Sequence, residues 1–524
     1  MPLAKYYQSS RMTSRILIFL LIPFIGFSQN IDDIFSDRGE IYFSFKYHNK
    51  SQLNAISDVV SIDHKTNNKL GFAYANKKEF IEFKRFGIEY TIIPHKPLDF
   101  TNENKNNWDF YPSYQQYVDM ATAFADSFPN ICKLHHLGTL NSGREILIIQ
   151  ISDYVGQKED EPSFLYTSSM HGDELAGYVL SLRLIDYILN NYGNNQRITN
   201  LVNEIDIWIN PLANPDGAYA GGNQNVNFAT RYNANWVDLN RNYPDPQDGP
   251  HPDGNPYQSE TNIFLELADS INFTISANIH GGVEVCNYPW DTWSNLTADN
   301  SWWEYVSHEY ADTCQANSSN GYFNYLNDGI TNGNDWYEVN GGRQDYMNYF
   351  RYCREFTLEI SNDKIPNPND LPNLWDANYG SLLNYMQQAL YGLRGIVTDS
   401  VTEIPLKAKI EILNHDTDSS HIYSNLPIGN YHRYLIQGNY DVSFSKNGYH
   451  PKIINTTILN NATTIKDIQL VPINITPTSI EQETEDNEVD LIIDIIGREN
   501  KQTRQGVKFI RNKNGMIQKQ IIIE

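Results

Sequence analysis

The sequence predicts an α/β protein whose main domain has a mixed, mainly parallel sheet with helices on both faces. Between residues 110 and 392, helical stretches alternate with short apolar stretches that have the length of buried strands. Residues 393–472 contain short strand-like runs separated by turn residues, which predicts a small β-sandwich. Ahead of these, residues 30–105 follow a βαββαβ order, typical of a small α+β domain. Several domains are expected from a chain of 524 residues.

Periodicity predicts the elements of residues 30–105. Ile41–Tyr47 alternates apolar and polar residues, as a half-buried strand does. Lys77–Phe86 has helical spacing of its apolar residues, and Gly87 ends the pattern. Shorter patterns predict a helix over Ser51–Ile56 and strands over Val59–Asp63, Leu70–Ala75 and Glu89–Pro94.

In the next two domains the elements are equally short and regular. The main domain has predicted helices over Tyr114–Ser127 and Leu175–Tyr192 and strands over Ile146–Ser152, Phe164–Thr167, Ile205–Asn210 and Phe273–Ile279. The sandwich has predicted strands over Leu393–Val397, Ala408–Leu413, Tyr431–Ile436, Tyr440–Ser445 and Thr464–Leu470. Residues 473–524 begin as a Thr/Glu-rich linker and end in three strand-like runs.

Charge and the first residues indicate where the protein works. A formal net charge of −24 argues against a nucleic-acid partner or an anionic membrane surface. Arg11 and Arg15 precede an apolar run, Ile16–Phe27, which predicts a secretory signal over residues 1–28. That run is too short to span a membrane, so we expect a secreted or cell-surface protein without a membrane span.

Four cysteines leave two alternatives open. In an exported protein, Cys132, Cys286, Cys314 and Cys353 would form up to two disulfides, with three connectivities. The alternative is that they are small buried thiols. None belongs to a C-x-x-C pair, which argues against a cysteine-bound zinc.

Three residues are candidate metal ligands. His171 and Glu174 follow one predicted strand and precede a helix, and their spacing lets both side chains point the same way. His280 directly follows another predicted strand. All three therefore lie beyond the carboxyl ends of sheet strands, where open α/β sheets place their sites. Catalytic zinc keeps three such protein ligands and one open position.

The remaining chemistry comes from two further stretches. Glu359 interrupts an apolar strand, where an unpaired carboxylate is costly, so it is the candidate general base. Arg231, Asn240 and Arg241 can form an anion site, because arginine binds a carboxylate through two parallel hydrogen bonds. Asp238 can orient a metal-bound histidine through its second ring nitrogen.

These stretches resemble the zinc metallocarboxypeptidases typified by pancreatic carboxypeptidase A. The resemblance is closest to the regulatory branch that contains carboxypeptidases E, N and D. It covers about residues 110–392 and rests on six strings: HGDE (171–174), NPDG (214–217), RYNANWVDLNRN (231–242), HGGVEVCNYPWDT (280–292), GITNGNDWYEVNGGRQDY (329–346) and CREFTLEISNDK (353–364).

The resemblance implies a role for each candidate residue. Three ligands, His171, Glu174 and His280, bind one zinc ion per chain; Asp238 supports His171, and Glu359 is the general base and acid. On the substrate side, Arg231 stabilises the oxyanion, Asn240 and Arg241 hold the terminal carboxylate, and Tyr337 closes over the substrate.

Two departures from the family pattern concern specificity. Asp173 stands where the branch usually has asparagine, and Arg343 where it usually has methionine. In the branch, acids after the NYP string favour a C-terminal Lys or Arg. Here Asp299 offers one acid and Gln344 matches the branch, whereas the charge of Arg343 would oppose a cationic side chain.

Resemblance also extends to the flanking regions. Residues 393–472 resemble the transthyretin-like domain of this branch. The tail, with IIDIIGRE at 492–499, resembles the C-terminal sorting domain of type IX secretion, whose machinery would be a partner during export. Residues 30–105 are a candidate prodomain.

The sequence thus predicts a secreted zinc carboxypeptidase that acts on the C-termini of peptides or proteins. Two alternatives are a peptidase of the same fold that cuts cell-wall stem peptides, and a non-catalytic binding protein with a decayed peptidase domain. The complete ligand set and Glu359 favour the secreted zinc carboxypeptidase over both alternatives.

Overall fold

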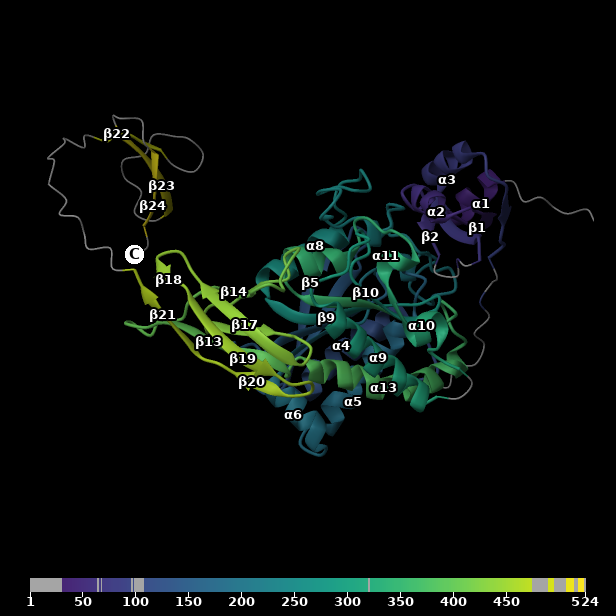
Figure 1. Cartoon of the computed structure of the whole chain (residues 1–524). Helices are drawn as coiled ribbons and strands as arrows, with labels where there is room; N and C mark the ends of the chain where they lie inside the picture. Colours follow the sequence, from purple (N-terminus) through teal and green to yellow (C-terminus); the bar gives the residue numbers. More distant parts are fainter. Residues whose placement is uncertain are drawn as a thin grey trace, which may run out of the picture. The chain divides into compact units, whose positions relative to one another are not determined.

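The computed structural model describes residues 31–63, 66, 68–95, 98, 108–318, 321–473, 489–493, 506–512 and 517–522. Residues up to Val471 form one compact unit, and those from Pro472 form a second (Figure 1). The predicted signal over residues 1–28 and the linker at 102–107 lie outside the described residues.

The main domain is built on an eight-stranded mixed sheet. In sheet order the strands are β11 (Ile330–Asn332), β10 (Glu284–Tyr288), β12 (Arg354–Ile360), β9 (Phe273–His280), β7 (Ser163–Ser168), β8 (Asp206–Asn210), β6 (Glu145–Ile151) and β5 (Cys132–Thr139). The central strands β12, β9, β7 and β8 are parallel to their neighbours in this group, whereas β5 and β6 pair antiparallel. The predicted mixed, mainly parallel sheet is therefore confirmed.

Helices cover both faces of this sheet, as the apolar pattern of β6 shows. Its Leu147 and Ile149 belong to one hydrophobic core, and its Ile146 and Ile148 belong to another. The first core includes residues of α4 (Tyr114–Ser127), α5 (Ala176–Asn191), α6 (Gln196–Glu204), α9 (Asn300–Ala316) and α13 (Leu371–Gln388). The second includes residues of α8 (Ser259–Ser270) and α12 (Arg343–Phe350), and Figure 1 shows α8 and α13 on opposite sides of the sheet.

The N-terminal elements form a small sheet with helices packed on it. The strand order is β2 (Ser61–Ile62), β3 (Leu70–Asn76), β1 (Glu40–Lys46) and β4 (Tyr90–Ile92). The helices are α1 (Ile31–Arg38), α2 (Lys50–Ser57), α3 (Lys77–Phe83) and the short η1 (Lys84–Phe86). A capping box fixes the start of α3, because the side chains and backbones of Asn76 and Glu79 bond each other reciprocally. We call residues 31–95 the N-domain.

Two short sheets follow the main domain. One contains β16 (Asn430–Arg433), β13 (Gly392–Asp399), β21 (Ile468–Pro472), β18 (Tyr449–His450) and β20 (Thr463–Ile465). The other contains β15 (Ile422–Tyr423), β14 (Lys409–Ile412), β17 (Gly438–Ser445) and β19 (Lys452–Ile458). Their inward residues share one apolar core, and we call residues 392–472 the sandwich. In the second unit, β22 (Val489–Ile493), β23 (Gly506–Asn512) and β24 (Ile517–Ile522) form an antiparallel sheet.

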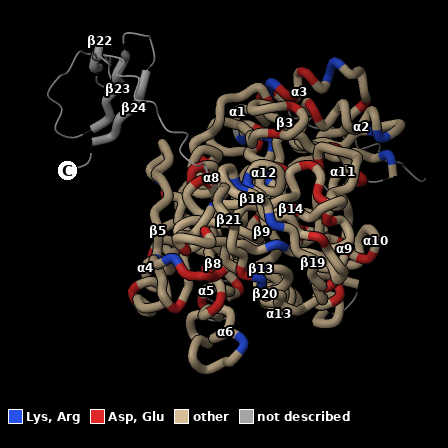
Figure 2. Tube along the Cα trace, turned by 60° about the vertical axis from the view of Figure 1, so that its left-hand side comes forward, with Lys and Arg blue, Asp and Glu red and all other residues tan. Residues whose placement is uncertain are grey.

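Three further observations concern the earlier expectations. All four cysteines are buried free thiols, which is the second of the two alternatives above. Searching the described residues finds no helix with the length and apolarity needed to cross a bilayer. Acidic and basic residues are both scattered over the first unit rather than gathered on one face, so charge alone marks no binding face (Figure 2).

Candidate active site and metal centre

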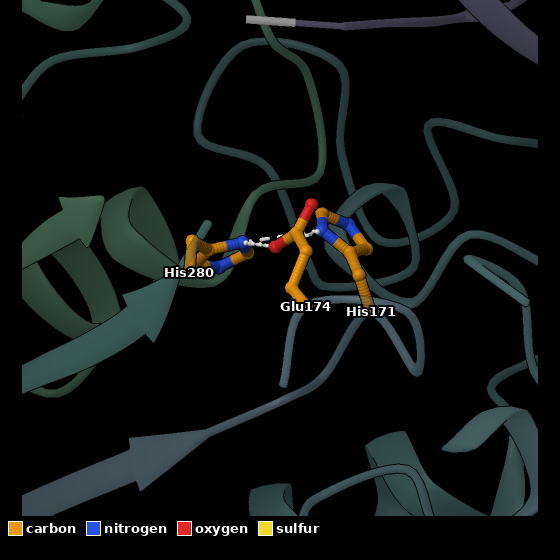
Figure 3. A group of neighbouring side chains, drawn as sticks. All are labelled: His171, Glu174 and His280. Atoms are coloured by element: carbon orange, nitrogen blue, oxygen red, sulfur yellow. Dashed lines mark hydrogen bonds and ion pairs between the residues drawn. The ribbon is translucent and has the colours of Figure 1, made fainter. Parts of the chain in front are cut away.

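The three predicted metal ligands meet at the carboxyl ends of two neighbouring parallel strands. His171 and Glu174 lie in the turn between β7 and α5, and His280 is the last residue of β9. β7 and β9 run parallel, with Ser168 opposite Ile279, so both turns emerge at the same sheet edge. The adjacent ends of β7 and β9 therefore bring together ligands that are far apart in sequence (Figure 3).

The geometry of these ligands fits one tetrahedral ion. Glu174 Oε2 lies 2.9 Å from His171 Nδ1 and 2.8 Å from His280 Nδ1, and the two ring nitrogens are 3.1 Å apart. Ligands about 2.0–2.1 Å from zinc in a tetrahedron stand about 3.3 Å from one another. The three atoms converge closely enough for one ion, and the donor set of two imidazoles and one carboxylate suits zinc.

Electrostatics favour the ligating forms of two of these groups. Burial opposes ionisation of Glu174, but His171, Lys364 and His280 outweigh it and hold the pKa of that carboxyl well below its usual range. Burial lowers the pKa of His280, which favours the neutral imidazole that a metal requires. The three side chains are at most 1% exposed.

Asp238 contacts His171, the histidine that it is predicted to orient. Its Oδ1 lies 3.1 Å from His171 Nε2, so the ring presents Nδ1 to the ligand cluster. The Asp238 carboxylate also caps the short helix η2 (Leu239–Arg241) by accepting the Asn240 N–H at 2.9 Å. Its Oδ2 accepts a hydrogen bond from Arg231 Nε at 3.0 Å.

Glu359 and Arg231 both adjoin the ligand cluster. Glu359 pairs in register with His280 across β12 and β9, and it is fully buried. Burial, and then the charge of Glu174, raise the pKa of Glu359 to about 8. Arg231 Nη1 lies 3.2 Å from His171 Nδ1 and 3.3 Å from Glu174 Oε1.

A small pocket beside the cluster gathers the candidate substrate-binding residues. It is lined by Arg231, Asn240, Arg241, Asn287, Asp291, Gly333, Trp336, Tyr337, Val339 and Thr357. Arg241 donates from Nη1 to the carbonyl of Asn240, and its buried Nη2 has no hydrogen-bond partner among the residues described here. A buried guanidinium nitrogen without a partner in a pocket can donate a hydrogen bond to a bound anion such as a carboxylate.

The structure changes the expectation for the acid of this pocket. Asp299 pairs instead with Arg354 and Arg433, each at 2.8 Å, and is not among the pocket residues. The acid in the pocket is Asp291, which follows the NYP string and is 3% exposed. Sequence reasoning missed it, although the string NYPWD contained the signal.

Asp291 is held by neighbours that leave it facing the pocket. Its Oδ1 accepts hydrogen bonds from Gln344 at 3.1 Å and Asn287 at 3.2 Å, so Gln344 contacts the pocket acid although it does not line the pocket itself. Burial raises the pKa of Asp291 to about 7. Any side chain at Gly333 would collide with it, because a Cβ there would stand 1.7 Å from Oδ1.

Arg343 does not enter this pocket. Its guanidinium donates to Glu355 at 2.9 Å and to Thr167, and it stacks on the ring of Phe264 at 5.4 Å. The expected repulsion of a cationic substrate is therefore absent, because the charge is buried and paired on another part of the sheet domain.

The zinc carboxypeptidase family matches residues 117–381, and the chain belongs to this family. It is 34% identical to the Homo sapiens carboxypeptidase D over 391 residues, covering 71% of this chain and 27% of that protein. It is also 34% identical to the Mus musculus carboxypeptidase N catalytic chain over 380 residues, covering 65% and 82% respectively. The chain thus spans about a quarter of the carboxypeptidase D relatives.

A solved structure supports the fold. The carboxypeptidase A from Helicoverpa armigera superposes with a TM-score of 0.54 at 18% identity, covering 67% of this chain and 97% of that one. The family is described as zinc carboxypeptidases, and His171, Glu174 and His280 form a group in this chain that could hold such an ion.

Proposed function

We propose that this protein is a secreted carboxypeptidase that removes the C-terminal residue of peptides or proteins. The observation that carries the proposal is the coincidence of two sites in one buried region. The ligand cluster of His171, Glu174 and His280 adjoins a pocket that contains the orphaned nitrogen of Arg241. A free terminal carboxylate bound by Arg241 would set its peptide bond beside the ligand cluster.

In this proposal each residue has one task. Zinc held by the three ligands would polarise the scissile carbonyl and acidify the attacking water. Glu359 takes a proton from that water and passes it to the leaving amine. Arg231 stabilises negative charge on the carbonyl oxygen. Asn240 and Arg241 fix the terminal carboxylate, and Tyr337 closes the pocket.

Replacing Glu359 tests the chemistry separately from binding. Glu359→Gln keeps the size but cannot act as a base, so we expect kcat to fall by at least about 10²-fold. Zinc content should stay at one per chain. A near-wild-type rate would show that another group is the base, and cleavage of stem peptides but not linear peptides would favour the cell-wall alternative.

The pocket supports a preference for a C-terminal Arg or Lys. Asp291 is the buried acid beside Gln344, and Arg343 points elsewhere. Asp291→Asn should reduce kcat/KM for a basic C-terminal residue by roughly 10-fold or more, since a buried charge pair is lost. The rate for a leucine-ending peptide should hardly change, and parallel losses for both would contradict this preference.

We further propose that the N-domain holds the enzyme latent. Tyr74 of β3 lies over two cations of the site, 5.9 Å from Arg231 and 5.0 Å from Lys364. Glu40 accepts the Arg231 backbone N–H at 3.1 Å, and Ser61 donates to Asp238 at 2.5 Å. These contacts cover Arg231, Lys364 and Asp238 and would hinder the approach of a peptide to them.

The N-domain also grips the loop that carries Tyr337. Asn54 of α2 donates to Glu338 Oε2 at 2.9 Å, and Ser57 donates to the Glu338 carbonyl at 3.0 Å. Tyr337 and Val339 belong to the hydrophobic core of the N-domain itself. Burying two such side chains is worth about 3 kcal/mol or more, and each hydrogen bond adds about 1 kcal/mol.

Export rests on the chain ends. We propose that the signal at 1–28 directs secretion, that the sandwich is a transthyretin-like domain, and that residues 473–524 carry a type IX sorting domain. The three-stranded sheet of β22, β23 and β24 is compatible with the last assignment. A reporter placed between residues 1–28 and residues 473–524 tests it, because the reporter should reach the surface only in cells with that machinery and only when residues 473–524 are present.

A further inference from the structure

Lys364 is a buried cation that the proposed chemistry does not use. It follows β12, and its carbonyl accepts the Leu175 N–H at 2.8 Å, which ties this segment to the start of α5. Its side chain is only 9% exposed. Nζ lies 2.5 Å from Glu174 Oε1 and 3.9 Å from Asp173 Oδ1. A buried lysine needs such partners, because an unpaired buried charge is costly.

The two oxygens of Glu174 have different partners. Oε2 faces the nitrogens of His171 and His280 and the Gly281 N–H at 3.3 Å. Oε1 faces the cations of Lys364 at 2.5 Å and Arg231 at 3.3 Å. A carboxylate whose one oxygen is held by two cations has its other oxygen fixed in direction. That fixed oxygen is the one in the ligand cluster.

We propose that Lys364 is a positioning residue for zinc binding: it holds Glu174 Oε1 so that Oε2 faces the metal, and Asp173 is its counter-charge. This inference rests on the proposed function. It gives a role to the buried Asp173 carboxylate, whose Oδ1 lies 3.9 Å from the lysine Nζ and offsets its charge.

The alternative interpretation is that Lys364 only stabilises the interface between the N-domain and the main domain. The Tyr74 ring lies 5.0 Å from its Nζ, so the lysine could matter for latency and not for the metal. Zinc affinity separates the two roles, because contact with Tyr74 has no bearing on the direction of Glu174.

The experiment measures zinc affinity of the full chain by competition with a chromophoric chelator. Lys364→Met removes the donor at similar length, and we expect the dissociation constant to rise 10–100-fold, the usual cost of losing a group that orients a metal ligand. Lys364→Arg keeps charge and donors and should recover most of the affinity. The visible spectrum of the Co²⁺-loaded Lys364→Met protein should shift, since the carboxylate ligand is released.

Two controls complete the design. Lys466→Met removes an exposed lysine of the sandwich and should leave zinc affinity unchanged. Tyr74→Ala removes the N-domain contact and should also leave it unchanged. The proposal is overturned if Lys364→Met binds zinc within about twofold of wild type or more tightly, or if Lys364→Arg or Tyr74→Ala is weakened equally. A wild-type chain that binds no zinc would instead overturn the proposed function.

Discussion

The N-domain and the sandwich both pack on the main domain. At the two interfaces, however, apolar side chains reach across in opposite directions. At the interface with the sandwich, Tyr434 of the sandwich lies in the core of the main domain. Its ring stacks on that of Trp302, with the ring centroids 5.6 Å apart. At the interface with the N-domain, Tyr337 and Val339 of the main domain lie in the core of the N-domain. Separating the sandwich would therefore open the core of the main domain, whereas separating the N-domain would open the core of the N-domain and release the loop that carries Tyr337.

Polar contacts reinforce this difference. The sandwich seam holds a buried network in which Arg433 bonds Asp299 at 2.8 Å and also pairs with Asp416. The N-domain interface contains a cavity of about 820 Å³ that is open to solvent and is lined in part by Asp238 and Arg241. We therefore expect the sandwich interface, which is well packed and has paired charges, to stay closed. The N-domain interface, which contains a cavity, should separate more easily.

The largest expected effect comes from separating the N-domain. We expect that a specific protease site inserted in the linker at 102–107, followed by cutting and removal of the N-domain, raises peptidase activity about 100-fold or more. A lid held by about 3 kcal/mol leaves roughly 1% of molecules open. Steady-state rates before and after cutting measure the change.

The control carries the same site in the exposed turn at Gly448 of the sandwich, where cutting should leave the rate unchanged. If cutting at 102–107 and removing the N-domain leave the rate as it was, the N-domain is not a lid.

At the other seam we expect a loss of stability. Arg433→Met leaves Asp416 and Asp299 buried with fewer cations, which should lower the free energy of unfolding by about 3 kcal/mol. Denaturant unfolding checks this value. Arg394→Met, an arginine of β13 that donates to the Asp160 carbonyl at an exposed site, should cost under about 0.5 kcal/mol. Equal losses in the two variants would show that the network contributes nothing special.

The same network predicts a pH dependence. Burial opposes ionisation of Asp416, but Arg433 and His415 outweigh it and lower the pKa of that carboxyl below its usual range. Because the folded pKa lies below the unfolded value of about 3.9, this stabilisation is present above about pH 5 and is lost as the pH falls further. Asp416→Asn should therefore lose less stability between pH 7 and pH 3 than wild type, and an identical loss would contradict the assignment.

The smallest effect is expected from the grip on the Tyr337 loop. Asn54→Ala removes its hydrogen bond to Glu338, worth about 1 kcal/mol, so the rate of the uncut chain should rise about fivefold. Thr122→Ala, which removes a helical side-chain bond at an exposed site of α4, is the control and should not raise the rate. After removal of the N-domain, Asn54→Ala and wild type should be equally active; a remaining difference would place the effect outside the seam.

Much of the fold could be predicted because its signals are local. The strand and helix at Phe164–Thr167 and Tyr114–Ser127 follow from periodicity and caps, and both form nearly as expected. The ligand cluster was predictable because His171 and Glu174 share one turn and His280 ends a neighbouring strand.

The rest depends on long-range packing that sequence spacing does not encode. Asp299 was expected in the substrate pocket, but a helix start and a distant strand bring it to Arg354 and Arg433. The string NYPWD marks Asp291 as a candidate, but its closeness to Gly333 in the pocket joins distant segments, and no local pattern reveals that contact. The position of the N-domain over the site was equally invisible in its own sequence.

The most direct test of the central claim compares a peptide with a free C-terminal arginine and the same peptide as its amide. With the N-domain removed, mass spectrometry should show release of the terminal arginine from the free acid, and a chelator should abolish it. The amide should react at least about 30-fold more slowly, since Arg241 loses a charged partner worth roughly 2–5 kcal/mol. Arg241→Ala should erase most of this difference by slowing cleavage of the acid. Equal cleavage of acid and amide, or full activity in chelator, would contradict the account.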